Sequence, residues 1–384
     1  MFLFAFLLFL CYACFIILAS YGFWKQKKKL LPTPLHGAKI PISIIIPARN
    51  EAANILSCLE SIAQNQKHNI PFEVLLMDDF SEDDTAQIVQ DFFKIHPIGR
   101  VIKLKDVLKG SRINAYKKKA IEIGIQASQY EWIVQTDADC IVPADWLYNM
   151  QIYMAQTDLQ FIAAPVAMMP LKGGIFSKLL YAFQSLDFMT MQGITAATHH
   201  YKIGLMCNGA NLAYRKSAFQ AVSGFKDIDG IASGDDMLLL HKINHQFPNS
   251  SFYLASPESI VNTASQPTLK DFLQQRIRWS SKATHYKDKR LTWILGLVFL
   301  FNLQLLLQLI LSIFYSDLIN LTLYLFIGKI AMEYLLLIPV SKFFNKQKQL
   351  FIFPFLQIFH VVYIVSTALL GTVGKYQWKN RTVK

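Results

Sequence analysis

Two kinds of hydrophobic pattern divide this chain of 384 residues. In some segments apolar residues follow one another almost without interruption, and each such segment is close to the roughly 20 residues that cross a bilayer as a helix. From residue 40 to about residue 255, short apolar runs instead alternate with stretches of helical periodicity. This alternation predicts an α/β domain with a mostly parallel sheet. The long apolar segments are residues 1–24, 293–315, 318–340 and 350–370.

The first apolar segment carries no charge and is followed directly by Lys25, Lys27, Lys28 and Lys29. A cleaved signal peptide would place basic residues before the apolar run and a small-residue cleavage site after it, and this segment has neither. The positive-inside rule therefore predicts a transmembrane helix over residues 1–24 with its amino terminus outside. We expect an integral protein of the inner or plasma membrane whose α/β domain is cytoplasmic.

The later apolar segments leave a difficulty at the end of the chain. The loop at residues 316–317 has no Lys or Arg, as an outside loop should, whereas residues 341–349 are basic, as an inside loop should be. Three complete crossings would then leave the basic tail, residues 373–384, outside. Either the rule fails or one segment enters the membrane without crossing it. Lys329 and Glu333, four residues apart on one helix face, point to the middle segment as the irregular one. The alternative is that these two residues simply pair with each other.

The composition agrees with a membrane protein that carries a large soluble domain. Hydrophobic residues make up 53% of the chain, 29 residues are Phe, and the formal net charge is +12. The basic residues cluster beside apolar segments, and no nucleic-acid-binding module is recognisable, which argues against a nucleic-acid partner. These residues are better placed to meet anionic lipid headgroups or an anionic nucleotide substrate.

Acidic residues follow the predicted strands of the α/β region. The second predicted strand ends in Asp78 and Asp79, and the central strand, which starts at Trp132, ends in Asp137 and Asp139. Open α/β sheets bind their ligands at the carboxyl ends of parallel strands. Carboxylates at such an edge can hold Mg²⁺ or Mn²⁺, with substrate phosphates completing the coordination shell.

Two further motifs lie on predicted helices. Asp235 and Asp236 stand at the start of one helix, where the macrodipole favours negative charge, so a simple helix cap is the alternative interpretation. Residues 268–290 have apolar residues at helical spacing with basic and amide residues between them, which favours a helix in the headgroup plane. The alternative for this segment is an ordinary surface helix.

Taken in chain order, these features resemble the family 2 glycosyltransferases. That membrane-bound class has a D, DxD, (T/G)(E/D)D and QxxRW pattern and includes cellulose, chitin and hyaluronan synthases and ceramide glucosyltransferase. The resemblance covers about residues 40–290 and implies a GT-A fold that binds a nucleotide diphosphate sugar, usually a UDP-sugar. The third motif reads GDD in this chain, at residues 234–236, where TED or GED is commoner. It keeps the aspartate that matches the base, Asp236, and has Asp235 in place of the usual glutamate. The matching residues are Asp79, Asp137, Asp139, Asp236, Gln275, Arg278 and Trp279.

The resemblance also implies a role for each matching residue. Asp236 matches the general base, and Arg278 matches the arginine that lies against the pyrophosphate. Asp137 and Asp139 match the ligands of a divalent cation, Mg²⁺ or Mn²⁺. The nucleotide-sugar-binding positions are Pro47, Arg49, Glu51, Asp79, Lys117, Lys119 and Asp137, and the acceptor or diphosphate positions are Gly209, Asn211, Asp235, Gln275 and Trp279.

Glycosyl transfer needs residues of these types. Displacing a nucleoside diphosphate develops negative charge on the leaving phosphate, which a divalent cation and a guanidinium stabilise. A carboxylate must accept the proton of the attacking hydroxyl on the opposite face of the sugar, and one direct displacement inverts the anomeric centre. The sequence therefore predicts an inverting hexosyltransferase.

The short membrane region bears on the acceptor. At most three apolar segments follow the α/β region, which are few helices to line a channel for a polymer. We therefore expect transfer to a lipid-linked or membrane-lipid acceptor at the cytoplasmic face. The alternatives are a short processive polysaccharide synthase and a catalytically inactive partner subunit that binds a sugar nucleotide.

The expected organisation has six parts. They are a transmembrane helix (1–24), a basic linker (25–39), a GT-A catalytic domain (40–265), an amphipathic interfacial helix with QxxRW (266–290), a C-terminal transmembrane region (291–372) and a basic tail (373–384).

Overall fold

The structure is a computed structural model of the chain. It describes all residues except 1, 30–38, 109–113, 232, 284–285, 287, 374–375, 379–380 and 384. The chain forms two compact units. The helical unit consists of Met1–Lys28, Pro170–Leu205 and Ser265–Tyr376, and the sheet unit consists of Lys29–Met169, Met206–Ala264 and Gln377–Lys384. Segment 170–205, which the sequence places inside the catalytic domain, is thus grouped with the helices.

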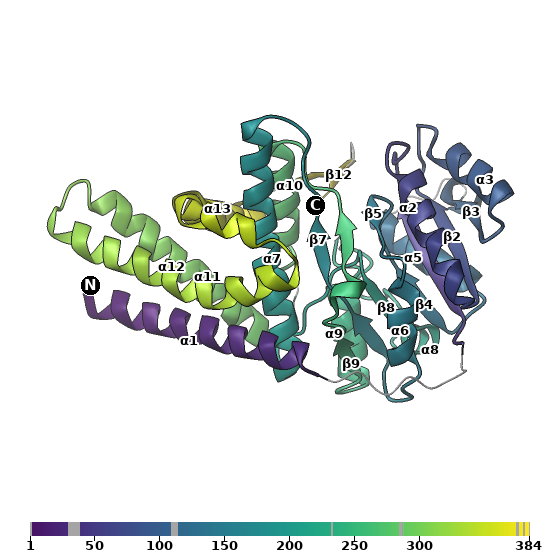
Figure 1. Cartoon of the computed structure of the whole chain (residues 1–384), viewed down its shortest axis with the longest axis horizontal. Helices are drawn as coiled ribbons and strands as arrows, with labels where there is room; N and C mark the ends of the chain where they lie inside the picture. Colours follow the sequence, from purple (N-terminus) through teal and green to yellow (C-terminus); the bar gives the residue numbers. More distant parts are fainter. Residues whose placement is uncertain are drawn as a thin grey trace. The chain divides into compact units, whose positions relative to one another are not determined.

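The main sheet of the sheet unit is mostly parallel, as predicted. Its strands are β1 (Ile42–Ala48), β2 (Phe72–Asp78), β3 (Gly99–Lys103), β4 (Trp132–Gln135), β6 (Phe161–Ala163), β8 (Leu212–Arg215) and β9 (Ser251–Tyr253). They lie in the order β3-β2-β1-β4-β8-β6-β9 (Figure 1). Among these strands, β8 alone runs antiparallel to its neighbours. The carboxyl ends of β1, β2 and β4 therefore meet at one edge.

The core of this sheet follows from its sequence. Strand β1 reads ISIIIPA, and its four isoleucines are fully buried. A strand covered on both faces has no solvent side, so it becomes a continuous apolar run instead of an alternating one. Helix α5 (Tyr116–Ala127) packs on β1 and β2. Gly124 permits this close approach, because a Cβ there would lie 3.0 Å from Ile45 Cγ2.

Shorter elements complete the sheet unit. The helices besides α5 are α2 (Ile55–Ala63), α3 (Thr85–Ile95), α4 (Leu104–Leu108), α6 (Trp146–Met154), α8 (Lys216–Ala221) and α9 (Met237–Gln246), with 3₁₀ turns η1 (Gln64–His68) and η2 (Pro257–Ser259). A small sheet contains β5 (Cys140–Ile141), β10 (Val261–Thr263) and β7 (Val166–Met168), and β11 (Tyr376–Trp378) pairs with β12 (Arg381–Val383).

The sequence suggests one strand over residues 161–168, and that prediction is wrong. The structure has two strands in different sheets, β6 and β7, which are separated by Ala164 and Pro165. Proline has no N–H to donate to a ladder, so it ends the pairing of β6 at this point.

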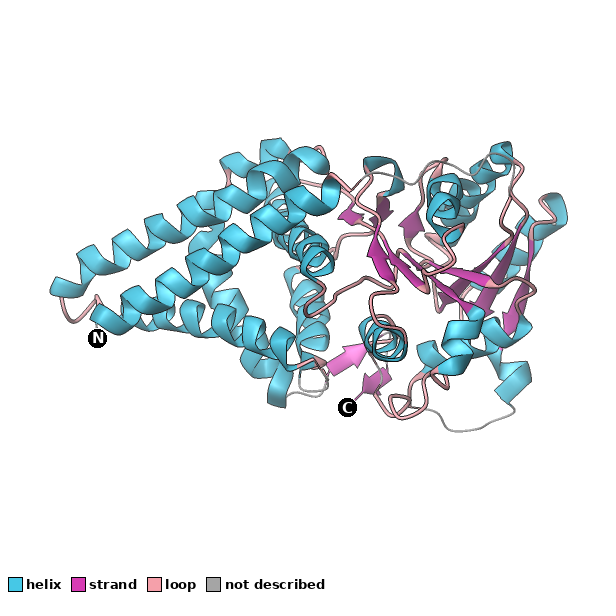
Figure 2. Cartoon of the chain, turned by 90° about the horizontal axis from the view of Figure 1, so that it is seen from below, coloured by secondary structure: helices cyan, strands magenta, loops and turns pink. Residues whose placement is uncertain are grey.

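The helical unit consists of long helices, as Figure 2 shows. They are α1 (Phe2–Lys27), α7 (Ile175–Tyr201), α10 (Leu269–Ser280), α11 (Lys289–Leu311), α12 (Asp317–Phe343) and α13 (Phe353–Val373), with the 3₁₀ turn η4 (Gln347–Phe351) before α13. Within the described part of the chain, α1, α11, α12 and α13 are long and apolar enough to cross a membrane. This finding agrees with a membrane protein.

Two helices differ from the sequence-based expectation. The amphipathic helix ends at Ser280, where residues 268–290 had been expected to be helical throughout. The middle apolar segment is the continuous helix α12, 27 residues long, and not an irregular one. Its two charged residues are buried and pair with each other, with Lys329 Nζ 2.6 Å from Glu333 Oε1. That pairing removes the charge-based reason for an irregular path.

Candidate active site

The expected nucleotide-binding residues meet where β1 and β2 end. Arg49, directly after β1, is buried and donates from Nη1 to the carbonyl oxygens of Asp79 (2.9 Å) and Phe80 (2.7 Å). Phe80 has a φ of 53°, a left-handed conformation that bulky residues rarely adopt. Arg49 therefore holds a strained turn. Pro47 pairs in register with strand β2, and Glu51 follows Arg49 by two residues, so all four positions lie at this edge.

A partly exposed lysine joins two of the acidic motifs in the sheet unit. Lys117 Nζ, from α5, lies 2.8 Å from Asp137 Oδ1 and 3.3 Å from Asp235 Oδ2. Burial opposes the charge of Lys117, but the two carboxylates outweigh it and raise its pKa above the ordinary value. Lys117 is thus a permanent cation between the DxD turn and the GDD motif. We call Lys117, Asp137 and Asp235 the ion cluster.

Asp236 lies beside the ion cluster at the start of α9. Its Oδ1 accepts the backbone N–H of Met237 at 2.7 Å, so it is the helix cap that the alternative interpretation proposed. Its Oδ2 also accepts the backbone N–H of Gly209 at 3.1 Å. A Cβ at Gly209 would lie 3.4 Å from Asp235 Oδ2 and 3.5 Å from Lys117 Nζ. The bare backbone of Gly209 therefore lies directly against the ion cluster.

The DxD turn supplies oxygen donors. Asp137 and Asp139 follow β4, and Asp139 Oδ1 accepts from Thr263 Oγ1 at 3.4 Å. Within the described residues, no three His, Cys, Asp or Glu side chains converge into a complete metal site. Mg²⁺ is often held by one or two carboxylates together with substrate phosphates. A donor set of two carboxylates fits a divalent cation of that kind, which binds together with its substrate.

The QxxRW motif lies on α10 in the helical unit. Arg276, inside the motif, is buried, and its Nη2 pairs with Asp187 Oδ2 of α7 at 2.9 Å. The guanidinium also lies 4.1 Å from the centre of the Trp279 ring. Gln275 Oε1 accepts from Arg276 Nη1 at 3.4 Å. Gln275, Arg278 and Trp279 are partly exposed, so α10 buries Arg276 and leaves the matched positions accessible.

The structure does not bring two expected residues into the site. Lys119 pairs with Glu122 one turn along α5, at 2.7 Å. Asn211 is fully buried and uses its whole carboxamide in the interior, where Oδ1 accepts from Trp146 Nε1 and Nδ2 donates to the carbonyl oxygens of Pro165 and Ser259. Both residues therefore have local structural partners in place of a ligand-facing position.

Sequence reasoning missed two residues that support the site. Gln135, the last residue of β4, is buried and donates from Nε2 to Asp235 Oδ2 at 3.2 Å. A polar residue at the end of a buried apolar strand was the available signal. The other residue is Asp187, the partner of Arg276. It lies within an apolar helix, where an isolated carboxylate would be costly, but nothing in the sequence identifies its partner.

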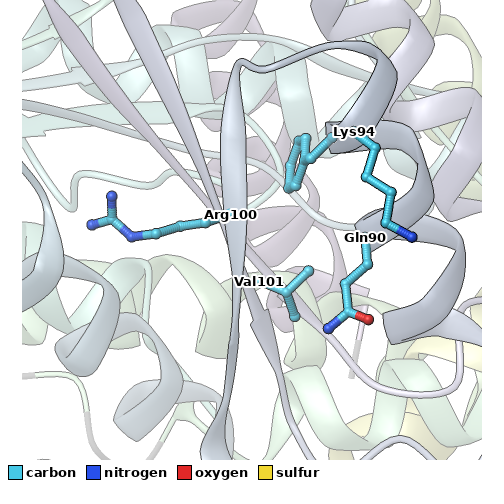
Figure 3. Close-up of a pocket in the computed structure, with 5 residues that line it drawn as sticks. Gln90, Lys94, Arg100 and Val101 are labelled. Carbon is cyan, nitrogen blue, oxygen red and sulfur yellow. The ribbon is translucent and has the colours of Figure 1, made fainter.

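A separate hollow in the sheet unit lies between α3 and β3 (Figure 3). Figure 3 shows that Arg100 points to the other side of β3 from Gln90, Lys94 and Val101. Arg100 instead donates to the carbonyl oxygen of Ala127 at 2.8 Å. The two basic side chains therefore do not face a common anion, and the hollow contains none of the expected site residues.

Comparison with known proteins identifies the family of the α/β region. Residues 43–222 match the family model described as glycosyl transferase family 2. The chain contains a family 2 glycosyltransferase domain. The family and the enzyme class predicted from the motifs are thus confirmed. The match to the family 2 domain ends before Asp235 and assigns no role to any single residue, so the roles of all the site residues, those of Asp236 and of QxxRW included, stay predictions.

Relatives of the family 2 domain act on different acceptors. The chain is 25% identical over 265 residues to the poly-β-1,6-N-acetyl-D-glucosamine synthase of Staphylococcus epidermidis, covering 68% of this chain and 59% of that one. It is 25% identical over 239 residues to the β-monoglucosyldiacylglycerol synthase of Trichormus variabilis, covering 62% and 48%. The chain therefore spans about half to three fifths of the length of these relatives.

A solved structure supports the fold beyond the family 2 domain. The mannosyltransferase PcManGT of Pyrobaculum calidifontis, in complex with GDP-Man and Mn²⁺, aligns with 96% of this chain and 98% of its own, at a TM-score of 0.57 and 15% identity. The alignment covers nearly the whole of both chains. The GT-A type of fold predicted for this chain is confirmed.

Proposed function

We propose that this chain transfers a sugar, with inversion, from a nucleotide diphosphate sugar of the UDP-sugar class to a lipid-linked or membrane-lipid acceptor at the cytoplasmic face of a membrane. The observation that carries the proposal is the ion cluster. Lys117 holds Asp137 of the DxD turn and Asp235 of the GDD motif at one point beside Gly209. Motifs about 100 residues apart in the chain thus share one site.

In this proposal each group has one task. Asp137 and Asp139 hold a divalent cation, which supplies positive charge to the leaving diphosphate when it is bound. Lys117 fixes the carboxylate of Asp137 and adds a second positive charge near it. Arg278 supplies the guanidinium that neutralises the pyrophosphate, because its planar fork suits phosphate oxygens. The Mn²⁺ bound to PcManGT supports a divalent cation of this type.

Asp236 is the proposed general base. Two backbone N–H groups, those of Met237 and Gly209, fix its carboxylate in one orientation. Each carboxylate oxygen has a second lone pair, so Asp236 can still accept a proton from an acceptor hydroxyl. This arrangement leaves a fixed carboxylate beside the ion cluster, as an inverting displacement requires.

A second candidate is a short processive synthase. One relative, which matches 265 residues of this chain, is a synthase of poly-β-1,6-N-acetyl-D-glucosamine, a polysaccharide. The glycolipid synthase of Trichormus variabilis favours the single-transfer proposal instead. The two candidates differ in the number of sugars added to each acceptor.

The test of the proposed function is a transfer assay. We expect the purified full chain, incubated with UDP-sugars and GDP-sugars, Mn²⁺ or Mg²⁺ and extracted membrane lipids, to give lipids heavier by one or two sugars. Chelation of the cation should abolish the product. A ladder of longer products would favour the processive synthase, and binding of the donor without any product would favour an inactive partner subunit. Mass separation of the products is the measurement.

Two neighbouring lysines offer a matched test of the ion cluster. Lys117→Met leaves the carboxylates of Asp137 and Asp235 facing each other without a cation, which we expect to cost about 1–3 kcal/mol of stability and to weaken donor binding. Lys119→Met removes only a partly exposed pair and should change stability by less than about 1 kcal/mol. Thermal unfolding and donor titration of the full chain in detergent measure both. Equal effects of the two substitutions would contradict the ion cluster as the donor site.

A further inference from the structure

The helices α1 and α12 of the helical unit run in the same direction. A Cβ at Gly328 would lie 2.8 Å from the ring of Phe9, and the ring of Phe23 lies 5.8 Å from that of Phe343. Figure 1 shows α1, α11 and α12 side by side along their lengths. Their two helix ends, at Lys27 and Phe343, therefore lie at the same end of this group.

Helix α11 begins at that same end. The backbone N–H of Gly204, just after α7, donates to Asp288 at 2.9 Å, directly before α11. Seven residues before Gly204, within α7, lies Ala197, and a Cβ at Gly22 of α1 would lie 2.9 Å from the Ala197 side chain. Helices α1, α11 and α12 thus share one end, which we call the basic end. Its basic residues include Lys25, Lys27, Lys28, Lys289, Arg290, Lys342, Lys346 and Lys348, and Asp288 pairs there with Arg290.

The first half of α13 lies against the middle of α12. Just before α13, the carbonyl oxygen of Leu350 accepts from Tyr334 Oη at 2.9 Å. Further along α13, Gln357 Nε2 donates to Glu333 Oε2 at 2.9 Å, and His360 Nδ1 lies 3.5 Å from Lys329 Nζ. From the basic end, α13 therefore goes inward to about the middle of α12.

The second half of α13 lies along α10. The Tyr363 ring stacks on Phe272 with centres 5.3 Å apart, and its hydroxyl donates to Asp187 at 3.4 Å. Two turns later, a Cβ at Gly371 would lie 2.6 Å from Ser280 Cβ. Ser280 ends α10, and α10 is tied to the basic end through α7, because Arg276 of α10 pairs with Asp187 of α7 and a Cβ at Gly193 of α7 would lie 2.6 Å from Val340 Cγ2, close to the end of α12. A crossing helix would instead end beside the turn at 316–317.

We infer that α13 is a re-entrant helix, which enters the membrane from the basic end and returns to it, so that this chain crosses the membrane three times. All backbone hydrogen bonds of such a helix are internal, so lipid tolerates it. The exposed face of α13 contacts the lipid acyl chains of the membrane leaflet at the basic end. They cover its exposed side chains Phe355, Ile358, Phe359, Val362, Leu369 and Leu370.

This path accounts for the charge of the tail. The sequence gives the tail after residue 373 a basic character, which three crossings after the catalytic region would leave on the wrong side of the membrane. With a re-entrant α13 the tail stays at the basic end.

Side-specific labelling tests the inference without any sugar transfer. In the full chain, the exposed Cys11 and Cys14 are replaced by serine, while the buried cysteines remain. Single cysteines are then introduced by Lys28→Cys at the basic end, Ser316→Cys at the opposite turn and Thr372→Cys at the end of α13, all exposed positions. A membrane-impermeant maleimide is applied to sealed vesicles of each orientation. We expect Thr372→Cys to react from the same side as Lys28→Cys.

The inference is overturned if Thr372→Cys reacts from the same side of the membrane as Ser316→Cys. If Thr372→Cys reacts from neither side, reporter proteins fused after Lys384 determine on which side of the membrane the tail lies. A fluorescent protein that folds only in the cytoplasm should then be bright and a phosphatase that folds only outside should be inactive, and the reverse result would establish a crossing. Because sugar transfer is not measured, a failed proposed function leaves this test intact.

Discussion

Replacing Asp236 by asparagine is expected to lower kcat by about 10²–10⁴-fold, the usual contribution of a positioned general base, while donor binding stays nearly unchanged. The physical reason is that asparagine has the size of aspartate but takes up no proton from an attacking hydroxyl. Its single carbonyl oxygen can still accept from Met237 and start α9. The contact with Gly209 is lost, at a cost of about 1 kcal/mol. Steady-state transfer and equilibrium donor binding measure the two effects separately.

A second substitution separates the base from the helix cap. Serine is as good an N-cap residue as aspartate, so Asp236→Ser should keep α9 intact. It supplies no carboxylate, so transfer should be lost as completely as in Asp236→Asn. Activity near that of the unchanged chain in Asp236→Ser would show that Asp236 only caps the helix, and the general base would have to be another residue.

Replacing Asp187 by leucine is expected to destabilise the helical unit by about 3–5 kcal/mol. The substitution leaves the guanidinium of Arg276 buried without its 2.9 Å partner, and a lone buried charge is far more costly than the loss of a pair. The midpoint of thermal unfolding in mild detergent is the measurement. Removing both charges, in Asp187→Leu with Arg276→Met, should recover part of the loss, because no unpaired charge remains.

The outcome of the double substitution decides the interpretation. If the double variant and Asp187→Leu lose the same stability, the loss comes from packing around α10 and not from the uncompensated charge. Transfer by the folded double variant adds a second readout, since Arg276 lies against Trp279 of the QxxRW motif. A change in KM without a change in unfolding would indicate that the pair positions the motif.

The sequence predicts the strand ends of the sheet unit well, for a physical reason. A parallel strand buried on both faces is a solid apolar run, so the first acidic residues after it mark its end. Asp79 follows β2 and Asp137 follows β4 closely in the structure. The ion cluster could not be predicted, because its contact between Lys117 and Asp235 joins residues far apart in the sequence.

The residues that sequence reasoning misplaced share one property. Lys119 and Asn211 are polar residues inside conspicuous motifs, and their types alone suggest ligand contacts. Which side of a helix or strand such a residue occupies depends on neighbours from other elements, such as Trp146 for Asn211. Arg276 shows the converse, since it falls on the apolar side of α10 with Phe272 and its partner comes from α7.

The contact between α1 and α7 has a consequence for biosynthesis. Gly22 leaves the ribosome long before Ala197, the residue it packs against, and the whole first part of the sheet is translated in between. Domains ordinarily fold as they emerge, starting with the amino-terminal part. Here the face of α1 that contacts α7 stays uncovered until α7 has been translated.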